Sequence, residues 1–188
     1  MPPPPLYWFY LVSTQEDAPM TERLCVDEGL VALAQALVSR LKQLNLTIVT
    51  AESCTGGLIA ALLSYAPGAS DCLQGGFVAY TKHQKTTALE VSARLIADGG
   101  SVSADIAYQM AKGALSHSDA MIGLAVTGVL GPDPDEDGNR PGLVYFAAGL
   151  RSGEVRVVKE QFTDGEPDRV RRQVITRAFA LVEEVATA

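Results

Sequence analysis

The sequence of 188 residues predicts an α/β protein, a three-layer α/β/α sandwich around a mixed, mostly parallel sheet. From about residue 30 onward, segments with the apolar spacing of helices alternate with short apolar segments rich in β-branched residues, and the connections between them are short. The segment 120–126 is apolar without alternation, which is typical of a strand covered by helices on both faces. Helix and strand patterns in alternation favour a parallel sheet.

The first element is an amphipathic helix over 30–44, because leucine and alanine recur there at helical spacing. The β-branched segment 46–50 then predicts a buried strand that stops at Ala51 or Glu52. The helix-forming residues 58–63 follow without a breaker, so we expect a second helix that begins near residue 55.

A second strand is predicted over 74–80. Ser103 is placed to cap a helix that runs through about Leu115. The apolar segment 120–126 supplies the next strand, which we expect at the centre of the sheet.

Two further strands are predicted over 143–150 and 155–162, and the four residues between them are few enough for a hairpin turn. This hairpin provides the one strand that we expect to run antiparallel to the others. The last helix carries apolar residues at helical spacing from Val170 to Val185.

The composition fits an enzyme or a binding domain in the cytoplasm. A formal net charge of -7 argues against a nucleic-acid partner, which would require a basic face. The three cysteines show neither the paired spacing of a zinc site nor the density of a disulfide scaffold, so we expect a reducing compartment and no metal. No segment reaches the roughly 20 apolar residues of a membrane span, and we expect no membrane partner.

The amino-terminal residues differ in character from the rest. A tetraproline start is followed by an apolar, aromatic segment that lacks the basic region and the cleavage site of a signal peptide. We expect residues 1–20 to form a poorly ordered extension and residues 21–188 to form a single domain.

The segment 50–57, with the sequence TAESCTGG, is the strongest candidate for a functional site. It places hydroxyl groups, a thiol and two glycines between a predicted strand and a predicted helix, where ligands bind in open α/β sheets. The glycines allow close approach to the backbone, and the first N–H groups of the helix attract anions. The same residues also fit an ordinary loop in which Ser53 or Thr55 only caps the helix.

Three other clusters sit at predicted ends of strands or helices and can converge on this turn. The segment 80–85 contains Tyr80 and Lys85, the segment 126–128 places Thr127 beside Gly128, and the segment 99–103 precedes a helix. Each also has a plain structural explanation, as a solvated basic turn, a strand end and a capped loop. The acidic segment 133–137 lacks the final glutamate of a calcium-binding loop, and we expect it to be a solvated turn.

Taken in order, these motifs resemble the CinA C-terminal domain family. The resemblance covers roughly residues 30–182, and TAESCTGG is its most specific part; the other matches are Pro67-Gly68-Ala69-Ser70, Gly76-Phe77-Val78, Tyr80 with Lys85, Val102-Ser103, Thr127-Gly128, Gly131-Pro132 and Val170-Arg171-Arg172. Stand-alone members of this family are nicotinamide-nucleotide amidases. The resemblance implies a three-layer fold, a small nucleotide substrate, no cofactor, no metal and a homo-oligomer.

The reaction that the resemblance implies is hydrolysis of the carboxamide of nicotinamide mononucleotide to nicotinate mononucleotide and ammonia. Ser53 is then the nucleophile and Lys85 the base, which must lose its proton to act. Lys82 lies one helical turn away if this segment is helical, and its charge would lower the pKa of Lys85. Tyr80 is expected to relay the proton or to orient the lysine.

Substrate binding is expected at the turn and at the end of the 120–126 strand. The N–H groups around Thr55, Gly56 and Gly57 are candidates for the oxyanion hole or for the phosphate, and Thr127 with Gly128 can bind the substrate or orient Ser53.

Some relatives carry an arginine in the turn before the last helix, where this chain has Pro167. Arg140, Arg169 or an arginine of another subunit is therefore expected to hold the phosphate. The acidic segment 133–137 also stands where relatives commonly have a glycine-rich loop.

Other interpretations remain open at this point. Cys54 is intrinsically more nucleophilic than serine, but we expect it to be a small buried residue. The two histidines lie in no nucleophile motif, so a Ser-His-Asp triad is disfavoured. The protein can also be an amidase for another small amide, or a nucleotide-binding or interaction module without catalytic activity.

Overall fold

The computed structural model describes residues 27–163 and 165–187, so the predicted extension over residues 1–20 lies outside the described residues. Within this part of the chain, five strands form one sheet in the order β2-β1-β3-β4-β5. The strands are β1 (Ile48–Glu52), β2 (Leu73–Val78), β3 (Ile122–Gly128), β4 (Leu143–Leu150) and β5 (Val155–Gln161). The helices are α2 (Glu28–Gln43), α3 (Leu58–Ser64), α4 (Lys82–Leu89), α5 (Ala93–Gly99), α6 (Ala104–Ser116) and α7 (Pro167–Ala186), with a short 3-10 helix η2 (Ala69–Asp71).

The sheet is mixed, as predicted. Strand β1 pairs in parallel with both β2 and β3, whereas β4 pairs antiparallel with both β3 and β5. Four strands therefore point the same way and β4 alone among the described strands opposes them. The carboxyl ends of β1, β2 and β3 meet at one edge of the sheet, which is where the candidate residues follow in the sequence.

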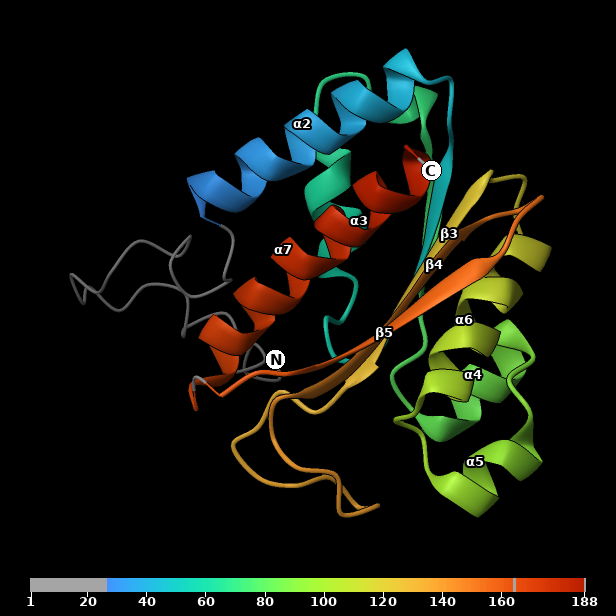
Figure 1. Cartoon of the computed structure of the whole chain (residues 1–188), viewed down its shortest axis with the longest axis vertical. Helices are drawn as coiled ribbons and strands as arrows, with labels where there is room; N and C mark the ends of the chain where they lie inside the picture. The colour runs from blue at the N-terminus through green and yellow to red at the C-terminus, as the bar shows by residue number, and fades with distance from the viewer. Residues whose placement is uncertain (1–26, 164, 188) are drawn as a thin grey trace, which may run out of the picture.

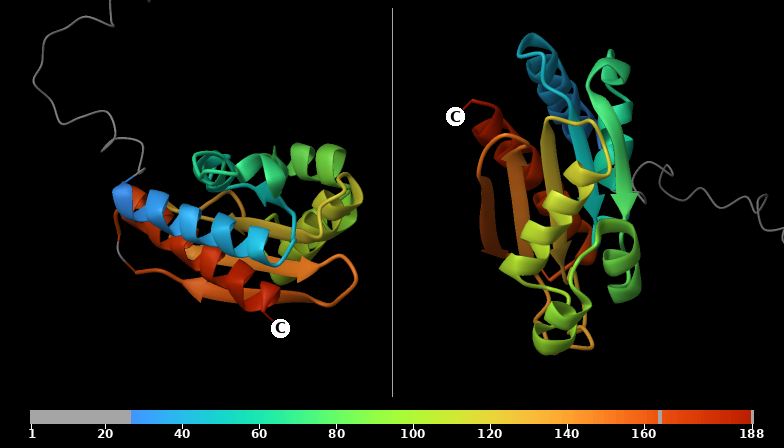
Figure 2. Two further views of the ribbon diagram at one scale, coloured as in Figure 1. Left: turned by 90° about the horizontal axis from the view of Figure 1, so that it is seen from above. Right: turned by 90° about the vertical axis from the view of Figure 1, so that its right-hand side faces the viewer.

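Helices cover both faces of the sheet and give three layers (Figure 1). Helices α2, α3 and α7 lie on one face, and α4, α5 and α6 lie on the other. The views from above and from the side show the same two layers (Figure 2). None of the helices in the described residues combines the length and the apolar character needed to cross a membrane.

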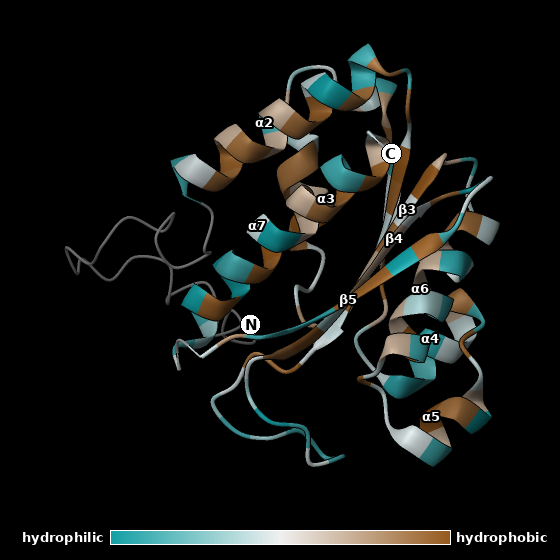
Figure 3. Ribbon diagram, in the orientation of Figure 1, coloured by the Kyte–Doolittle hydropathy of each residue, from teal (hydrophilic) through white to brown (hydrophobic). Residues whose placement is uncertain are grey.

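The core divides between the two faces because side chains alternate along each strand. In β3, Leu124 contributes to the core under α2, α3 and α7, whereas its neighbour Ala125 contributes to the core under α6. Strand β3 is buried along almost its whole length, as expected for a strand covered on both faces, whereas the edge strand β5 carries hydrophilic residues (Figure 3). Small residues bring α6 close to the sheet, since a Cβ atom added at Gly123 would lie 2.8 Å from the carbonyl oxygen of Ala111.

Most predicted boundaries hold to within two residues, and the main shift occurs after β1. Ser103 caps α6 as predicted, and its hydroxyl accepts a hydrogen bond from the N–H of Ile106. Helix α3 begins at Leu58 rather than near residue 55, because Gly56 and Gly57 have positive φ angles that do not continue a right-handed helix. The turn that carries Ser53 is therefore longer than predicted.

Candidate active site

The candidate site lies at the carboxyl edge of the sheet, around the turn from β1 to α3. Strand β1 places Ser53 there, and the N–H of Ser53 donates to the carbonyl of Val126 in β3. Helix α4 follows the neighbouring strand β2 and carries Lys85 on its buried side. The two side chains meet although 32 residues separate them, with Lys85 Nζ 3.0 Å from Ser53 Oγ.

Glu52 organises the turn from inside the protein. Its carboxylate is buried and accepts hydrogen bonds from the backbone N–H groups of Gly57, Ile59 and Ala60 and from the hydroxyls of Thr50 and Thr55. The bonds to the helix are 2.9–3.1 Å long. A carboxylate at the N-terminus of a helix satisfies donors that the helix itself leaves unpaired.

This arrangement corrects two expectations for the turn. The N–H of Gly57 donates to Glu52 and that of Gly56 donates to the carbonyl of Ser53, so neither is available for an oxyanion or a phosphate. Within the described residues, no other residue accepts a hydrogen bond from the N–H of Cys54 or Thr55. Cys54 and Thr55 are the two residues that follow Ser53. Their N–H groups are therefore the donors that the turn leaves for an oxyanion.

Neither Ser53 nor Thr55 caps α3, so the interpretation of the turn as an ordinary capped loop is wrong. The cap residue of α3 is Gly57, which has no side chain to contribute. The hydroxyl of Thr55 instead donates to Glu52 at 2.7 Å. Ser53 is left with Lys85 as the partner of its hydroxyl.

Lys85 is among the largest fully buried side chains of the described residues, with 1% of its surface exposed. Burial lowers the pKa of its ammonium group below the ordinary 10.5, because the charged form is removed from water. The positive charge of Lys82 acts in the same direction, whereas the carboxylates of Asp135 and Asp137 oppose it. Lys82 lowers the pKa of Lys85, as expected, but burial lowers that pKa by more.

A cavity of about 470 Å³ opens over Ser53 and Lys85. Its wall also contains residues from the loops after β2 and β3, from the segment before α6 and from α7; the full set is Ser53, Cys54, Tyr80, Lys85, Ser101, Val102, Gly128, Val129, Leu130, Gly131, Asp135, Glu136 and Arg171. A shallower depression adjoins it along the start of α3, and the two share Cys54, Tyr80 and Arg171. The combined hollow is large enough for a small ligand with two parts.

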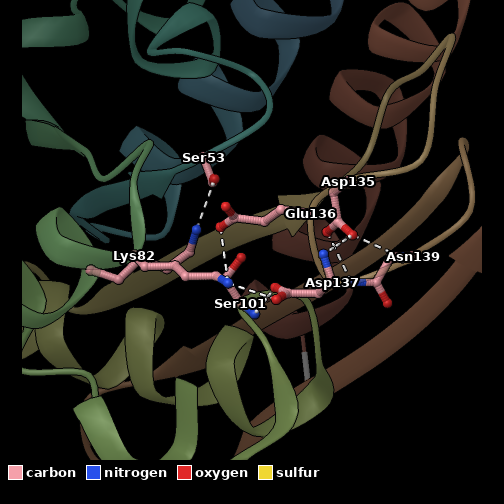
Figure 4. A network of polar contacts seen from close by, with 8 residues as sticks. Ser53, Lys82, Ser101, Asp135, Glu136, Asp137 and Asn139 are labelled. Carbon is pink, nitrogen blue, oxygen red and sulfur yellow. Dashed lines mark hydrogen bonds and ion pairs between the residues drawn. The ribbon is translucent and has the colours of Figure 1, made fainter. Parts of the chain in front are cut away.

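The loop between β3 and β4 is hydrophilic (Figure 3) and forms one wall of the cavity. Lys82 at the start of α4 contacts Glu136 at 2.9 Å and Asp137 at 2.6 Å. The second oxygen of Asp137 accepts the N–H of Ser101 at 3.1 Å (Figure 4). The segment 133–137 is largely exposed, as expected for a solvated acidic turn, but it is also tied to two other segments and lines the site.

The substrate-binding residues expected from the sequence are only partly in place. Gly128 lines the cavity, and Thr55, Gly56 and Gly57 line the adjoining depression. Thr127 is fully buried and its hydroxyl donates to the carbonyl of Ser101 at 3.0 Å, so it holds a loop rather than the substrate or Ser53. Arg140 is exposed and lines neither hollow.

Tyr80 lines both hollows, and its side chain is 67% exposed. The side chain of Tyr80 forms no hydrogen bond to Lys85 or Ser53. The structure therefore contains no direct path for the proton relay expected of Tyr80. Its position instead favours contact with a ligand across the shared rim.

Sequence reasoning assigned no role to Glu52 or Arg171. Arg171 belongs to α7, lines both hollows, and pairs with Asp168 at 2.5 Å. It is the arginine that the structure places at the cavity, where the sequence suggested Arg140 or Arg169. The one available signal was that Arg171 belongs to the motif Val170-Arg171-Arg172.

Cys54 is a poor competitor for the role of nucleophile. Desolvation raises the pKa of its thiol to about 12, so the reactive thiolate is scarce at neutral pH. In the described part of the chain, no cluster of three or more histidine, cysteine, aspartate or glutamate side chains could hold a metal ion. The chemistry that the described side chains support is nucleophilic attack by Ser53 assisted by Lys85.

Comparisons with known proteins agree with the family resemblance and with the fold. The model of the family described as CinA C-terminal domain matches residues 30–186. The nicotinamide-nucleotide amidohydrolase PncC of Pseudomonas putida is 38% identical over 152 residues, which cover 81% of this chain and 94% of that protein. A CinA-like protein of Citrifermentans bemidjiense is 42% identical over 131 residues, which cover 70% of this chain.

Several other relatives are much longer than this chain. The chain spans 36% of a Desulforamulus reducens relative and 31% of the one from Citrifermentans bemidjiense. Among solved structures, the competence/damage inducible protein CihA from Agrobacterium tumefaciens has a TM-score of 0.80 and 34% sequence identity, with coverage of 85% of this chain and 96% of that chain. The likeness therefore extends over the fold and over the segments that carry the site.

Proposed function

Because the chain belongs to the CinA C-terminal domain family, we propose that it is a nicotinamide-nucleotide amidase, which hydrolyses nicotinamide mononucleotide to nicotinate mononucleotide and ammonia. One observation carries this proposal: Lys85 Nζ lies 3.0 Å from Ser53 Oγ at the floor of a cavity. The Pseudomonas putida relative named as a nicotinamide-nucleotide amidohydrolase supports the choice of substrate, since the match covers 94% of that protein.

The first half of the reaction uses the contact between the two side chains. Lys85 in its neutral form accepts the proton of the Ser53 hydroxyl while Oγ attacks the carboxamide carbon. The oxyanion that forms can be held by the N–H groups of Cys54 and Thr55. Lys85 then returns its proton to the departing nitrogen, so ammonia leaves and an ester on Ser53 remains.

The second half repeats these steps with water. Lys85 accepts a proton from the water as it attacks the ester, and the acid is released when Ser53 recovers a proton from Lys85. The burial of Lys85 serves both halves, because a lowered pKa makes its neutral form more accessible than that of an exposed lysine.

The phosphate of the nucleotide is assigned to Arg171. Its guanidinium group stands at the rim shared by the cavity and the adjoining depression, which is the position for a group remote from the reacting amide. The N-terminus of α3 is excluded as the phosphate site because Glu52 already occupies its donors. Arginine binds phosphate oxygens through paired N–H donors.

The test is an assay of ammonia release from nicotinamide mononucleotide by the purified chain, with Ser53→Ala as the negative control. A panel of other small amides, assayed in parallel, identifies a different substrate if one is preferred. Release of ammonia from no amide, together with binding of the nucleotide by calorimetry, would instead establish a binding module.

A further inference from the structure

The cavity over Ser53 and the adjoining depression along the start of α3 differ in the charged residues that line them. Asp135 and Glu136 line the cavity over Ser53, whereas the residues that line the adjoining depression include no carboxylate. Arg171 stands at the rim between them. A ligand that spans both hollows therefore meets negative charge near Ser53 and positive charge farther away.

The two carboxylates of the cavity wall are held in position by other groups. Asp135 accepts the N–H groups of Asp137 and Asn139 at 3.0 and 2.8 Å, and its second oxygen accepts the amide group of Asn139 at 2.9 Å. Glu136 is held by Lys82 at 2.9 Å (Figure 4). Fixed charges interact more strongly with a ligand than mobile ones do, because no ordering is needed when the ligand binds.

The positive groups near this wall do not cancel its charge. Lys82 is shared between Glu136 and Asp137, so one ammonium group faces two carboxylates, and Asp135 bonds to neutral N–H groups instead. Lys85, the other amine of the cavity, is neutral in the form that acts as a base. Asp135 of the wall and its neighbour Asp137 both raise the pKa of Lys85, as expected for carboxylates close to the amine beside Ser53.

We propose that the carboxylates of Asp135 and Glu136 recognise a positive charge on the ring that carries the reacting amide, so that the site selects a zwitterionic substrate with a cationic ring and a distant phosphate. This inference rests on the proposed function, and it adds the property by which the substrate is selected. The ring nitrogen of nicotinamide mononucleotide is quaternary and positively charged, and it lies in the same ring as the carboxamide. With the amide at Ser53, the ring charge falls in the acidic cavity and the phosphate extends toward Arg171.

The reduced form of the nucleotide provides the sharpest probe. It keeps the carboxamide, the ribose and the phosphate, but its dihydropyridine ring is uncharged. Dissociation constants of both forms are measured by calorimetry in a Ser53→Ala background, so that turnover does not interfere. The double substitution Asp135→Asn with Glu136→Gln removes the wall charge with little change in shape, because Asn139 can rotate its amide to pair with an asparagine at position 135 and Lys82 keeps Asp137.

We expect the double variant to weaken binding of the oxidised nucleotide by about tenfold, the order expected for loss of a charge interaction in a partly screened pocket. Binding of the reduced nucleotide should change by less than about twofold, since its ring carries no charge. The matched control is Asp133→Asn, which removes a charge from the same loop at an exposed residue outside the cavity wall. It should leave both constants unchanged.

Three outcomes would overturn the inference: equal weakening of both forms, an equal effect of Asp133→Asn, or no binding of either form. The proposed function is judged separately, by ammonia release from the wild-type chain. Selective binding of the oxidised form without ammonia release would refute the amidase and leave the charge selection standing.

Discussion

Lys85 Nζ contacts Ser53 Oγ at 3.0 Å, and this contact joins helix α4 to the turn after β1. Neither residue is close to the other in sequence, so the pair exists only when β2 is docked beside β1. The reacting groups therefore depend on the correct pairing of an edge strand.

The first prediction concerns the nucleophile. Ser53→Ala should lower kcat for ammonia release by about a thousandfold or more, as loss of a catalytic nucleophile does. The matched variant Cys54→Ser, at the neighbouring residue, should retain most activity because the thiol takes no part in the reaction. Circular dichroism should show both variants folded. Normal turnover by Ser53→Ala, or its loss in Cys54→Ser, would reassign the nucleophile.

The second prediction concerns pH. Because Lys85 acts only when neutral, kcat/KM should rise with pH until Lys85 has lost its proton and then level off. Lys82→Met removes a positive charge that lowers the pKa of Lys85 and releases Asp137, whose carboxylate raises it, so the rising limb should move to higher pH, by up to about one unit. A pH profile that does not move in this variant would contradict the electrostatic coupling.

The third prediction concerns the stability cost of the buried amine. Lys85 has a lower pKa in the folded protein than in the unfolded chain, so between those two values the unfolded chain binds more protons and stability rises with pH. Lys85→Met should abolish activity and raise the free energy of unfolding at pH 7, by about 1 kcal/mol. The gain should shrink as the pH approaches 10.5, the ordinary pKa of lysine.

Urea denaturation at several pH values measures this effect, and Lys112→Met serves as its control because Lys112 lies exposed on α6. If Lys85→Met and Lys112→Met raise the free energy of unfolding equally, or if the increase in Lys85→Met does not depend on pH, then burial of Lys85 does not destabilise the protein.

The fourth prediction concerns Glu52. Glu52→Gln places an amide NH₂ group where a carboxylate oxygen accepted N–H donors, so buried donors lose their partner. The free energy of unfolding should fall by about 2 kcal/mol, and kcat should fall with it because the turn that carries Ser53 is displaced. Glu28→Gln, at an exposed position in the first turn of α2, is the comparison that should change little. Unchanged unfolding of Glu52→Gln in urea would show that the network is dispensable.

The fifth prediction concerns the phosphate. Arg171→Ala should raise KM for nicotinamide mononucleotide by about 10- to 100-fold, the effect of losing a charge-assisted contact. It should leave KM for nicotinamide riboside, which has no phosphate, nearly unchanged. Arg172→Ala is the neighbouring control, since Arg172 pairs with Asp27 at the start of α2. An equal rise in KM for both substrates would assign Arg171 to another role.

The sequence predicted those elements whose signals are local. The β-branched segment before the turn, the serine cap of α6 and the hairpin of β4 and β5 each depend on nearby residues, and the structure confirms them. The short helices α4 and α5 are not among the predicted elements. Helix α4 has few apolar residues, and its start is marked only by Thr81, whose hydroxyl accepts a hydrogen bond from the N–H of Gln84.

The parts of the site that sequence reasoning missed depend on distant contacts. Glu52 caps a helix that begins six residues later, which is outside the usual spacing of a capping side chain. Asp137 is recognised as part of the site only when its partners Lys82 and Ser101 are known, and these lie 55 and 36 residues away. Thr127 was assigned to the substrate because a hydroxyl at a strand end is ambiguous until its acceptor is known.

The carboxylate that fills the start of α3 has a practical consequence for inhibition. Free phosphate or sulfate in a buffer cannot compete for those amide donors, because the chain supplies its own anion there. Competitive inhibition by inorganic phosphate would then report occupancy elsewhere in the site, and the part of it that is lost in Arg171→Ala would measure the contribution of that side chain.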